Sequence, residues 1–255
     1  MIEIISNLDQ EYLISQMPDL PRVKSGLKTI DEICDDFAMG ELVVLSGCPK
    51  HGKSLLVKTM MKNMYHSGNI TMLFSYEETP RELYTKFPNR SRDILFYVPS
   101  KLQTKNVKWL EEAIDKAMND LGVKIFFIDH GQKLGMLSNH HSGAEVWGDM
   151  AQDIKEIARS KEIIVFLVWH LAKNTVRREE DLTGDLLRDT GMLLGELDTL
   201  LMNFREVKTS DGIVQAETYS SIVVERTRRT GEMMKTVPVV KRGYYLEEIG
   251  GVPCQ

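Results

Sequence analysis

Eight consecutive residues, Gly47 to Ser54, have the types and spacing of a phosphate-binding loop. They read GCPKHGKS, which matches G-x-x-x-x-G-K-[ST] at every fixed position. Glycines let backbone N–H groups close around phosphate oxygens, the lysine reaches the outer phosphates, and the serine hydroxyl is a magnesium ligand. The motif predicts an ATP site in which Lys53 contacts the β- and γ-phosphates and Ser54 the metal. The residues expected to line the nucleotide are Gly47, Cys48, Pro49, Lys50, His51, Gly52, Lys53, Ser54 and Leu55.

Polar side chains also close three other apolar stretches. Asp129 ends KIFFID, the pair Glu77 and Glu78 ends TMLFSYEE, and His170 ends EIIVFLVWH. A carboxylate at the end of a buried strand commonly holds magnesium in such sites, so we expect Asp129 to be a metal ligand and not a helix cap. From the residues alone, either glutamate could polarise an attacking water or simply begin a helix. His170 could sense the γ-phosphate or be an ordinary strand-end histidine.

Alternating strands and helices must position these groups. Apolar runs predict strands at residues 41–47, 69–75, 93–99, 123–129 and 162–170. Helical spacing predicts helices after the phosphate-binding loop, at 105–120 and at 144–160, and TPRE (79–82) has the pattern of a capping box. Ligands of open α/β sheets bind at the carboxyl ends of the strands, so the four polar positions are expected to share one edge.

The last part of the chain predicts three more strands, at residues 198–204, 220–226 and 236–242. They lie too close together in sequence for helical crossovers, so we expect them to form antiparallel hairpins. The predicted fold class is α/β. It is a mostly parallel sheet flanked by helices, with antiparallel strands at its C-terminal edge.

Composition and charge limit the class of protein. Hydrophobic residues make up 42% and charged residues 27%, which excludes a disordered or fibrous chain. A membrane span is not expected, because the sequence has no apolar run of about 18 residues. The three cysteines are odd in number and lack metal-ligand spacing, which favours a reducing cytosol.

The net charge of −5 gives no general sign of nucleic-acid binding. It does not exclude such binding, because a ring protein can carry basic residues on its inner face alone. Two local runs are basic, LAKNTVRR (171–178) and ERTRRT (225–230). Taken alone, each is either a solvated surface or a phosphate contact.

The order of these motifs resembles that of the RecA-fold motor domain of replicative hexameric helicases, both the DnaB-like and the phage primase–helicase kinds. The likeness runs from about Val23 to Ile249. The similar segments are SGLKTID (25–31), FSYEETP (74–80), FFIDH (126–130), FLVWHLAKN (166–174), LLRDTGMLLGELD (186–198) and VERTRRTG (224–231). The resemblance implies a RecA-like P-loop NTPase that uses ATP and Mg²⁺ to move along single-stranded DNA.

The resemblance also implies roles for individual residues. It selects Glu77 over Glu78 as the residue that activates water, and it makes His170 the γ-phosphate sensor. Arg228 becomes an arginine finger that reaches the nucleotide of a neighbouring subunit, with Arg226 as the accompanying cation. The residues expected to contact DNA are Arg188, Asp189 and Gly191, with Lys173, Arg177 and Arg178 in the loop before them.

Two regions are expected, a linker at residues 1–20 and a motor domain at 21–255. EYLISQM (11–17) is the expected segment that docks on the next subunit. The implied partners are single-stranded DNA, further copies of the chain in a hexamer, and a separate primase or helicase loader, in a bacterial or phage-infected cytosol. Two alternatives stay open: a RecA-like recombinase or mediator, and a non-motor ATPase switched by nucleotide.

Overall fold

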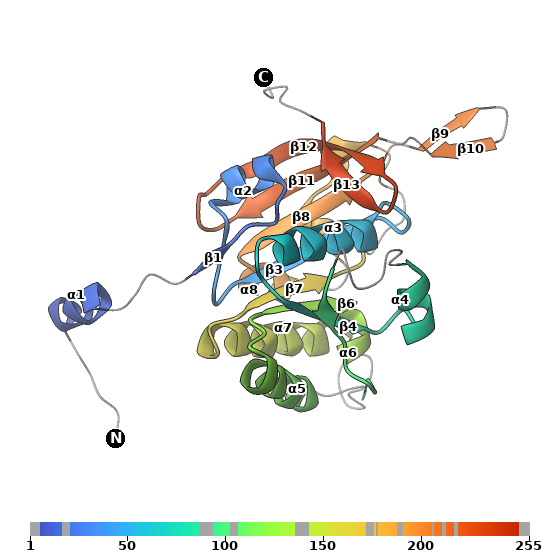
Figure 1. Cartoon of the computed structure of the whole chain (residues 1–255). Helices are drawn as coiled ribbons and strands as arrows, with labels where there is room; N and C mark the ends of the chain where they lie inside the picture. Colours follow the sequence, from blue (N-terminus) through green and yellow to red (C-terminus); the bar gives the residue numbers. More distant parts are fainter. Residues whose placement is uncertain are drawn as a thin grey trace.

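A nine-stranded sheet forms the centre of the described chain (Figure 1). The computed structural model describes residues 6–16, 21–86, 94–102, 107–135, 143–171, 176, 178–187, 191–205, 207–210, 213–216 and 219–249. In spatial order the strands are β13 (Tyr245–Glu248), β12 (Met233–Arg242), β11 (Tyr219–Thr227), β8 (Thr199–Phe204), β3 (Leu42–Gly47), β7 (Ile164–Val168), β6 (Ile125–Asp129), β4 (Thr71–Ser75) and β5 (Phe96–Tyr97).

The remaining elements surround or extend this sheet. The α-helices are α1 (Asn7–Gln16), α2 (Lys28–Cys34), α3 (Lys53–His66), α4 (Pro80–Lys86), α5 (Val107–Leu121), α6 (Gln132–Gly135), α7 (Gly143–Ser160) and α8 (Gly191–Glu196). Two 3-10 turns, η1 (Glu179–Asp181) and η2 (Gly184–Leu186), follow β7. Two short antiparallel pairs complete the description, β1 (Arg22–Val23) with β2 (Phe37–Ala38) and β9 (Val207–Ser210) with β10 (Ile213–Ala216).

The strand directions confirm the predicted fold class. The strands from β8 to β5 pair in parallel, whereas β11, β12 and β13 are antiparallel. Residues 198–204 form the predicted antiparallel pair with β11, but β8 also pairs in parallel with β3 and so joins the parallel part of the sheet, which was not predicted. The segment between β7 and β8, which includes α8, is long enough to bring the chain back to the end of the sheet at which the parallel strands begin.

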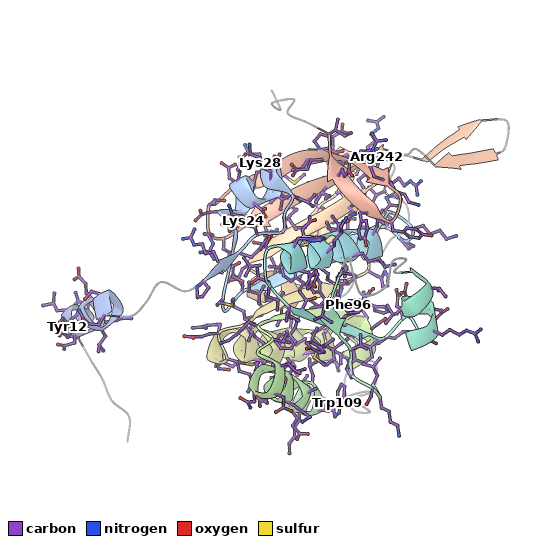
Figure 2. The ribbon with its side chains drawn as sticks, in the orientation of Figure 1. Tyr12, Lys24, Lys28, Phe96, Trp109 and Arg242 are labelled. Atoms are coloured by element: carbon purple, nitrogen blue, oxygen red, sulfur yellow. The ribbon has the colours of Figure 1, made fainter. Side chains whose placement is uncertain are left out.

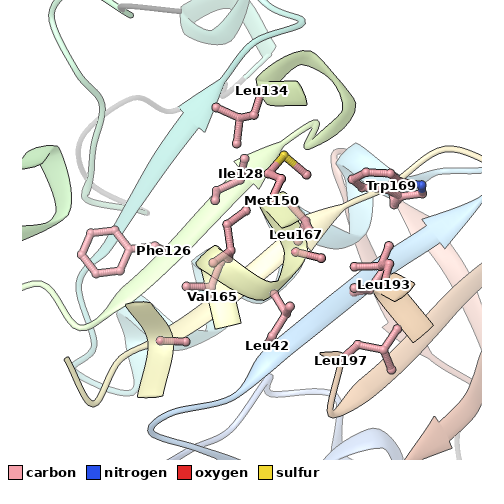
Figure 3. Close-up of a cluster of buried hydrophobic side chains, with 14 of the residues drawn as sticks. Leu42, Phe126, Ile128, Leu134, Met150, Val165, Leu167, Trp169, Leu193 and Leu197 are labelled. Atoms are coloured by element: carbon pink, nitrogen blue, oxygen red, sulfur yellow. The ribbon is translucent and has the colours of Figure 1, made fainter. Parts of the chain in front are cut away.

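Two apolar cores lie on opposite faces of the sheet. Alternate side chains of β3 separate them, since Leu42 and Val44 face one core and Val43 and Leu45 the other. The first core is covered by α5, α7 and α8, and Figure 3 shows it around Phe126, Met150 and Trp169, among others. The second core is covered by α2 and α3. Helices on both faces leave the strand ends as the exposed edges of the sheet.

Local signals in the sequence were correct at α4. The Thr79 backbone N–H donates to Glu82 Oε2 at 2.8 Å, and the Glu82 N–H donates to Thr79 Oγ1 at 3.3 Å. These reciprocal bonds are the predicted capping box. The strand expected at 93–99 is shorter, because β5 comprises only Phe96 and Tyr97 within the described residues. No helix in the described part of the chain is long and apolar enough to span a membrane.

Helix α1 lies apart from the sheet domain in Figure 1 and begins earlier than the expected EYLISQM segment. Its Tyr12 side chain, labelled in Figure 2, is 67% exposed, and Leu8 and Leu13 are also exposed. Ser6 caps the helix, because its Oγ accepts the Asp9 backbone N–H at 3.1 Å. The helix therefore presents apolar side chains that the described domain does not cover.

Candidate active site

The turn between β3 and α3 forms the phosphate-binding loop. Three of its residues have positive φ, Gly47 at 138°, Lys50 at 67° and Gly52 at 98°. A Cβ on Gly47 would lie 2.4 Å from the backbone oxygen of Asn203, so β8 approaches too closely for any side chain there. The glycines at both ends of the motif are thus required by the shape of the loop itself.

Lys53, the first residue of α3, points back into the loop. Its Nζ donates to the carbonyl oxygens of Gly47 at 2.8 Å and Cys48 at 3.0 Å. The side chain is buried, and this burial lowers the pKa of the lysine. A cation held inside a loop at a helix N-terminus gives an anion both a charge and oriented N–H groups to bind. Ser54, beside it, is half-buried.

Asp129 ends β6 with its carboxylate directed into the protein. It is 5% exposed, and within the described part of the chain its Oδ1 has no hydrogen-bond partner. Burial, followed by the charges of Glu77 and Glu78, raises the pKa of Asp129 to about 6. A buried carboxylate oxygen without a donor is the hard ligand that a magnesium ion prefers, so Asp129 and Ser54 fit a magnesium nucleotide.

Glu77 lies just beyond β4 and contacts two histidines. Its Oε1 is 3.0 Å from His170 Nε2 and 3.3 Å from His130 Nε2. The hydrogen bond from His170 lowers the pKa of Glu77 to about 2, so the side chain is a carboxylate at neutral pH. Glu78 instead has its backbone N–H bound to Ser75 Oγ at 3.2 Å. The geometry therefore distinguishes Glu77 from Glu78, which the residues alone left equivalent and between which the family resemblance selected Glu77.

His130 and Gln132 are site residues for which no role was predicted. Gln132 Oε1 lies 2.9 Å from His130 Nδ1 and accepts the His170 backbone N–H at 3.2 Å, while Gln132 Nε2 donates to the His170 carbonyl at 3.1 Å. Burial, followed by the charge of His170, lowers the pKa of His130 to about 4. His130 is thus neutral at pH 7, and its contact with Glu77 is not an ion pair. The signal for His130 was its place directly after Asp129.

Residues inside the phosphate-binding loop contact the end of β8. His51 Nδ1 accepts the Arg205 backbone N–H at 3.0 Å, and the His51 ring packs edge-on against Phe204 at 5.6 Å. Asn203 is fully buried below the loop, and neither polar atom of its amide has a hydrogen-bond partner among the described residues. These β8 contacts were not predicted, because they join residues far apart in the sequence.

The two arginines assigned to a neighbouring site lie at the other end of the sheet. The Arg228 N–H donates to the Asp198 carbonyl at 2.8 Å, just before β8 begins, and its exposed guanidinium contacts the Gly195 carbonyl. Arg226 forms a bidentate pair with Glu225, at 2.6 Å and 3.0 Å. The registers of β11, β8 and β3 place this turn at the opposite strand ends from the phosphate-binding loop.

Only part of the expected DNA-contacting set can be described. Arg178 is exposed next to η1, where Glu179 is bound by Ser221 and by Thr236 Oγ1 at 2.5 Å. Gly191 begins α8. The positions outside the described residues are Lys173, Arg177, Arg188 and Asp189.

Residues 22–116 match the family model of the DnaB-like helicase C-terminal domain. The ATPase domain of G40P superposes with a TM-score of 0.74 at 16% identity, covering 95% of this chain and 96% of that one. The chain resembles the DnaB-like helicase motor in sequence and in fold. A DnaB-like replicative helicase, described with its interactions with primase, gives a TM-score of 0.76 at 18% identity, covering 96% of this chain and 68% of that one.

This chain is also similar to KaiC proteins. The circadian clock oscillator protein KaiC of Acaryochloris marina is 32% identical over 71 residues, and that of Thermostichus vulcanus is 34% identical over 71 residues. The matched stretch covers 28% of this chain and 14% of each relative. A KaiC-like protein of Pyrococcus horikoshii shares the fold, with a TM-score of 0.63 at 15% identity over 90% of this chain and 99% of that one.

The buried Asp129 carboxylate should lower the stability of the protein without metal. Between its ordinary pKa of 3.8 and its raised pKa of about 6, the folded protein binds more protons than the unfolded chain, so stability falls as pH rises. Asp129→Asn should therefore increase the free energy of unfolding at pH 7 by about 3 kcal/mol, since one pKa unit corresponds to about 1.4 kcal/mol.

Urea unfolding in EDTA at several pH values measures this effect. The difference between Asp129→Asn and wild type should disappear below about pH 3, where the carboxyl is protonated in both states. The exposed Asp149 provides the control substitution, Asp149→Asn, which should leave the midpoint unchanged. An Asp129→Asn protein no more stable than wild type at pH 7 would contradict the account of this carboxylate.

Proposed function

We propose that this chain is an ATP-dependent translocase on single-stranded DNA that works as a ring, as a replicative helicase motor does. The observation that carries the proposal is the arrangement at one sheet edge, where the Lys53 loop, Asp129 and the Glu77–His170 pair come from four adjoining parallel strands. The match to the DnaB-like helicase domain supports the same conclusion. The proposed work on DNA places the protein in the cytosol of a bacterium or an infected host.

The contacts of each side chain support its role. Lys53 and the loop N–H groups would bind the phosphates, and Ser54 and Asp129 would hold magnesium, which neutralises phosphate charge when bound. Glu77, a carboxylate held by His170, would accept a proton from the attacking water. A γ-phosphate that attracts Glu77 or the water would disturb the hydrogen bond between Glu77 and His170. His170 would then change position when the γ-phosphate is present.

A neighbouring copy would complete this site. Each paired residue of β3 adds about 3.3 Å, so the stretch from Val43 to Gly47 separates the Arg228 turn from its own phosphate-binding loop by roughly 13 Å of strand. Arg228 is exposed, and within the described part of the chain its guanidinium bonds only to the Gly195 carbonyl, so it could turn toward another chain. Arg226 would accompany it by exchanging part of its pairing with Glu225 for phosphate.

The proposed DNA contacts belong to the segment between β7 and α8. Leu171 pairs with Leu187, so the ends of this segment meet beyond β7, at the edge that carries the phosphate-binding loop. Cations there would contact phosphates without reading sequence, which agrees with local basic runs in an acidic protein. The proposed set is Lys173, Arg177, Arg178, Arg188, Asp189 and Gly191. A separate primase or loader is a further proposed partner.

Helix α1 would join subunits. Its exposed Leu8, Tyr12 and Leu13 have no cover within the described domain, and residues 1–20 would dock them on the motor domain, 21–255, of the next copy. Deleting residues 1–18 should convert rings to smaller species in analytical ultracentrifugation with ssDNA. An unchanged sedimentation coefficient would exclude this role for the helix.

A second candidate is a non-motor ATPase that changes partner with nucleotide, and the likeness to KaiC proteins is the observation that favours it. A RecA-like recombinase or mediator is a further alternative within the same fold. DNA dependence distinguishes these functions, because a motor must couple turnover to the strand it moves on. A recombinase would respond to DNA but form filaments and not closed rings.

ATP turnover with and without ssDNA tests the proposed function. We expect ssDNA to increase the rate, and Glu77→Gln to lower it by about 10²–10⁴-fold while ATP-analogue binding persists, because a positioned base contributes about that much. Glu78→Gln is the matched control and should retain turnover. A rate unaffected by ssDNA would exclude a DNA motor, and a loss of turnover in Glu78→Gln alone would reassign the catalytic carboxylate.

Mixed subunits test whether Arg228 acts across an interface. Arg228→Ala and Lys53→Ala should each lose hydrolysis, the first by about 10³–10⁵-fold. Their mixture should regain activity, because an intact loop in one chain would meet an intact Arg228 in the next. Lys235→Ala, which removes an exposed cation beside Glu232 on the same hairpin, should retain activity alone. A mixture as inactive as its components would contradict the arginine-finger assignment.

A further inference from the structure

Three potential metal ligands converge beside the proposed magnesium position. They are Glu77 Oε1, His130 Nε2 and His170 Nε2, and all three atoms lie within 4.8 Å of one another. Two of the separations, 3.0 Å and 3.3 Å, involve the carboxylate oxygen. A tetrahedral zinc ion with bonds of about 2.0–2.1 Å places neighbouring ligand atoms about 3.3 Å apart. The cluster therefore has nearly the dimensions of such a site without a large rearrangement.

The hydrogen bonds around Gln132 fix which nitrogen of His130 faces Glu77. Both backbone groups of His170 orient the Gln132 amide, because its Oε1 accepts from the N–H and its Nε2 donates to the carbonyl. The oxygen of this amide therefore faces His130 Nδ1, which must carry the proton. The other ring nitrogen, Nε2, therefore faces the cluster, 3.3 Å from a carboxylate oxygen of Glu77.

The hydrogen bond from His130 Nδ1 to the amide oxygen of Gln132 is the usual arrangement for a metal-ligating histidine, because the second partner fixes the tautomer and the orientation of the ring. Both histidine side chains are partly or largely buried, while Glu77 remains 35% exposed. An ion can thus reach the cluster from the solvent side of Glu77.

We propose that Glu77, His130 and His170 form a site for one divalent transition-metal ion of the zinc class, distinct from the oxygen-ligated magnesium position at Asp129 and Ser54. Two imidazoles and one carboxylate favour zinc, cobalt or nickel over magnesium. The fourth position would be open to water. The metal would hold Glu77 and His170 away from a γ-phosphate, so it would inhibit turnover; this consequence rests on the proposed function, whereas metal binding itself does not.

Titration with Co²⁺ tests the site directly, using metal-free full-length protein without nucleotide. We expect one ion per chain, with the visible absorption of four-coordinate cobalt, displaced by Zn²⁺ but not by excess Mg²⁺. Glu77→Gln, His130→Ala and His170→Ala should each abolish this absorption. Gln132→Ala should weaken binding by about 10–100-fold, the usual effect of losing a group that orients a metal ligand.

His66→Ala is the matched control, because His66 is an exposed histidine on α3 and should leave the titration unchanged. Circular dichroism identifies any variant that fails to fold, and Glu77→Gln keeps the shape of its side chain. Absence of cobalt absorption in wild type, or equal binding by wild type and all three ligand variants, would overturn the proposal. Cobalt binding without inhibition of ATP turnover by Zn²⁺ would uphold the site and contradict the role of Glu77 in hydrolysis.

Discussion

Parallel pairing of β3, β7, β6 and β4 is the constraint on which the candidate site depends. Because these strands run in the same direction and in close register, their carboxyl ends meet at one edge. Ser75 lies opposite Asp129, Ile128 opposite Leu167, and Leu45 opposite Val168. Residues far apart in sequence thereby become neighbours. The pairing of their strands positions them, and no direct contact between their side chains is needed. The two apolar cores keep the strands in this register.

The antiparallel strands position the turn that contains Arg228. Since β11 runs against β8, it carries the arginine turn to the strand ends where Asp198 and Leu42 lie, away from the phosphate-binding loop. Asp198 Oδ2 accepts the Leu42 N–H at 2.7 Å and Lys155 Nζ at 2.6 Å, so the base of the turn is fixed by helix α7 as well as by the sheet. A domain with a phosphate-binding loop at one end and an exposed arginine at the other is suited to head-to-tail assembly.

Much of this arrangement could be predicted from local sequence. GCPKHGKS, the acid that ends KIFFID and the TPRE cap are short patterns whose chemistry depends on adjacent residues, and the loop and the cap have the predicted form. The direction of β8 could not be predicted from its own residues, because it depends on how far the chain travels after β7. Likewise Gln132 and His170, 38 residues apart, and His51 and Arg205, 154 apart, meet only through the folded sheet.

Electron microscopy of the protein with an ATP analogue, Mg²⁺ and ssDNA tests most directly the account in which two neighbouring copies share each nucleotide site. The account predicts closed rings with DNA in the central channel and the Arg228 turn of each copy against the phosphate-binding loop of the next. Particles that stay single, or rings in which Arg228 faces solvent at every interface, would contradict it.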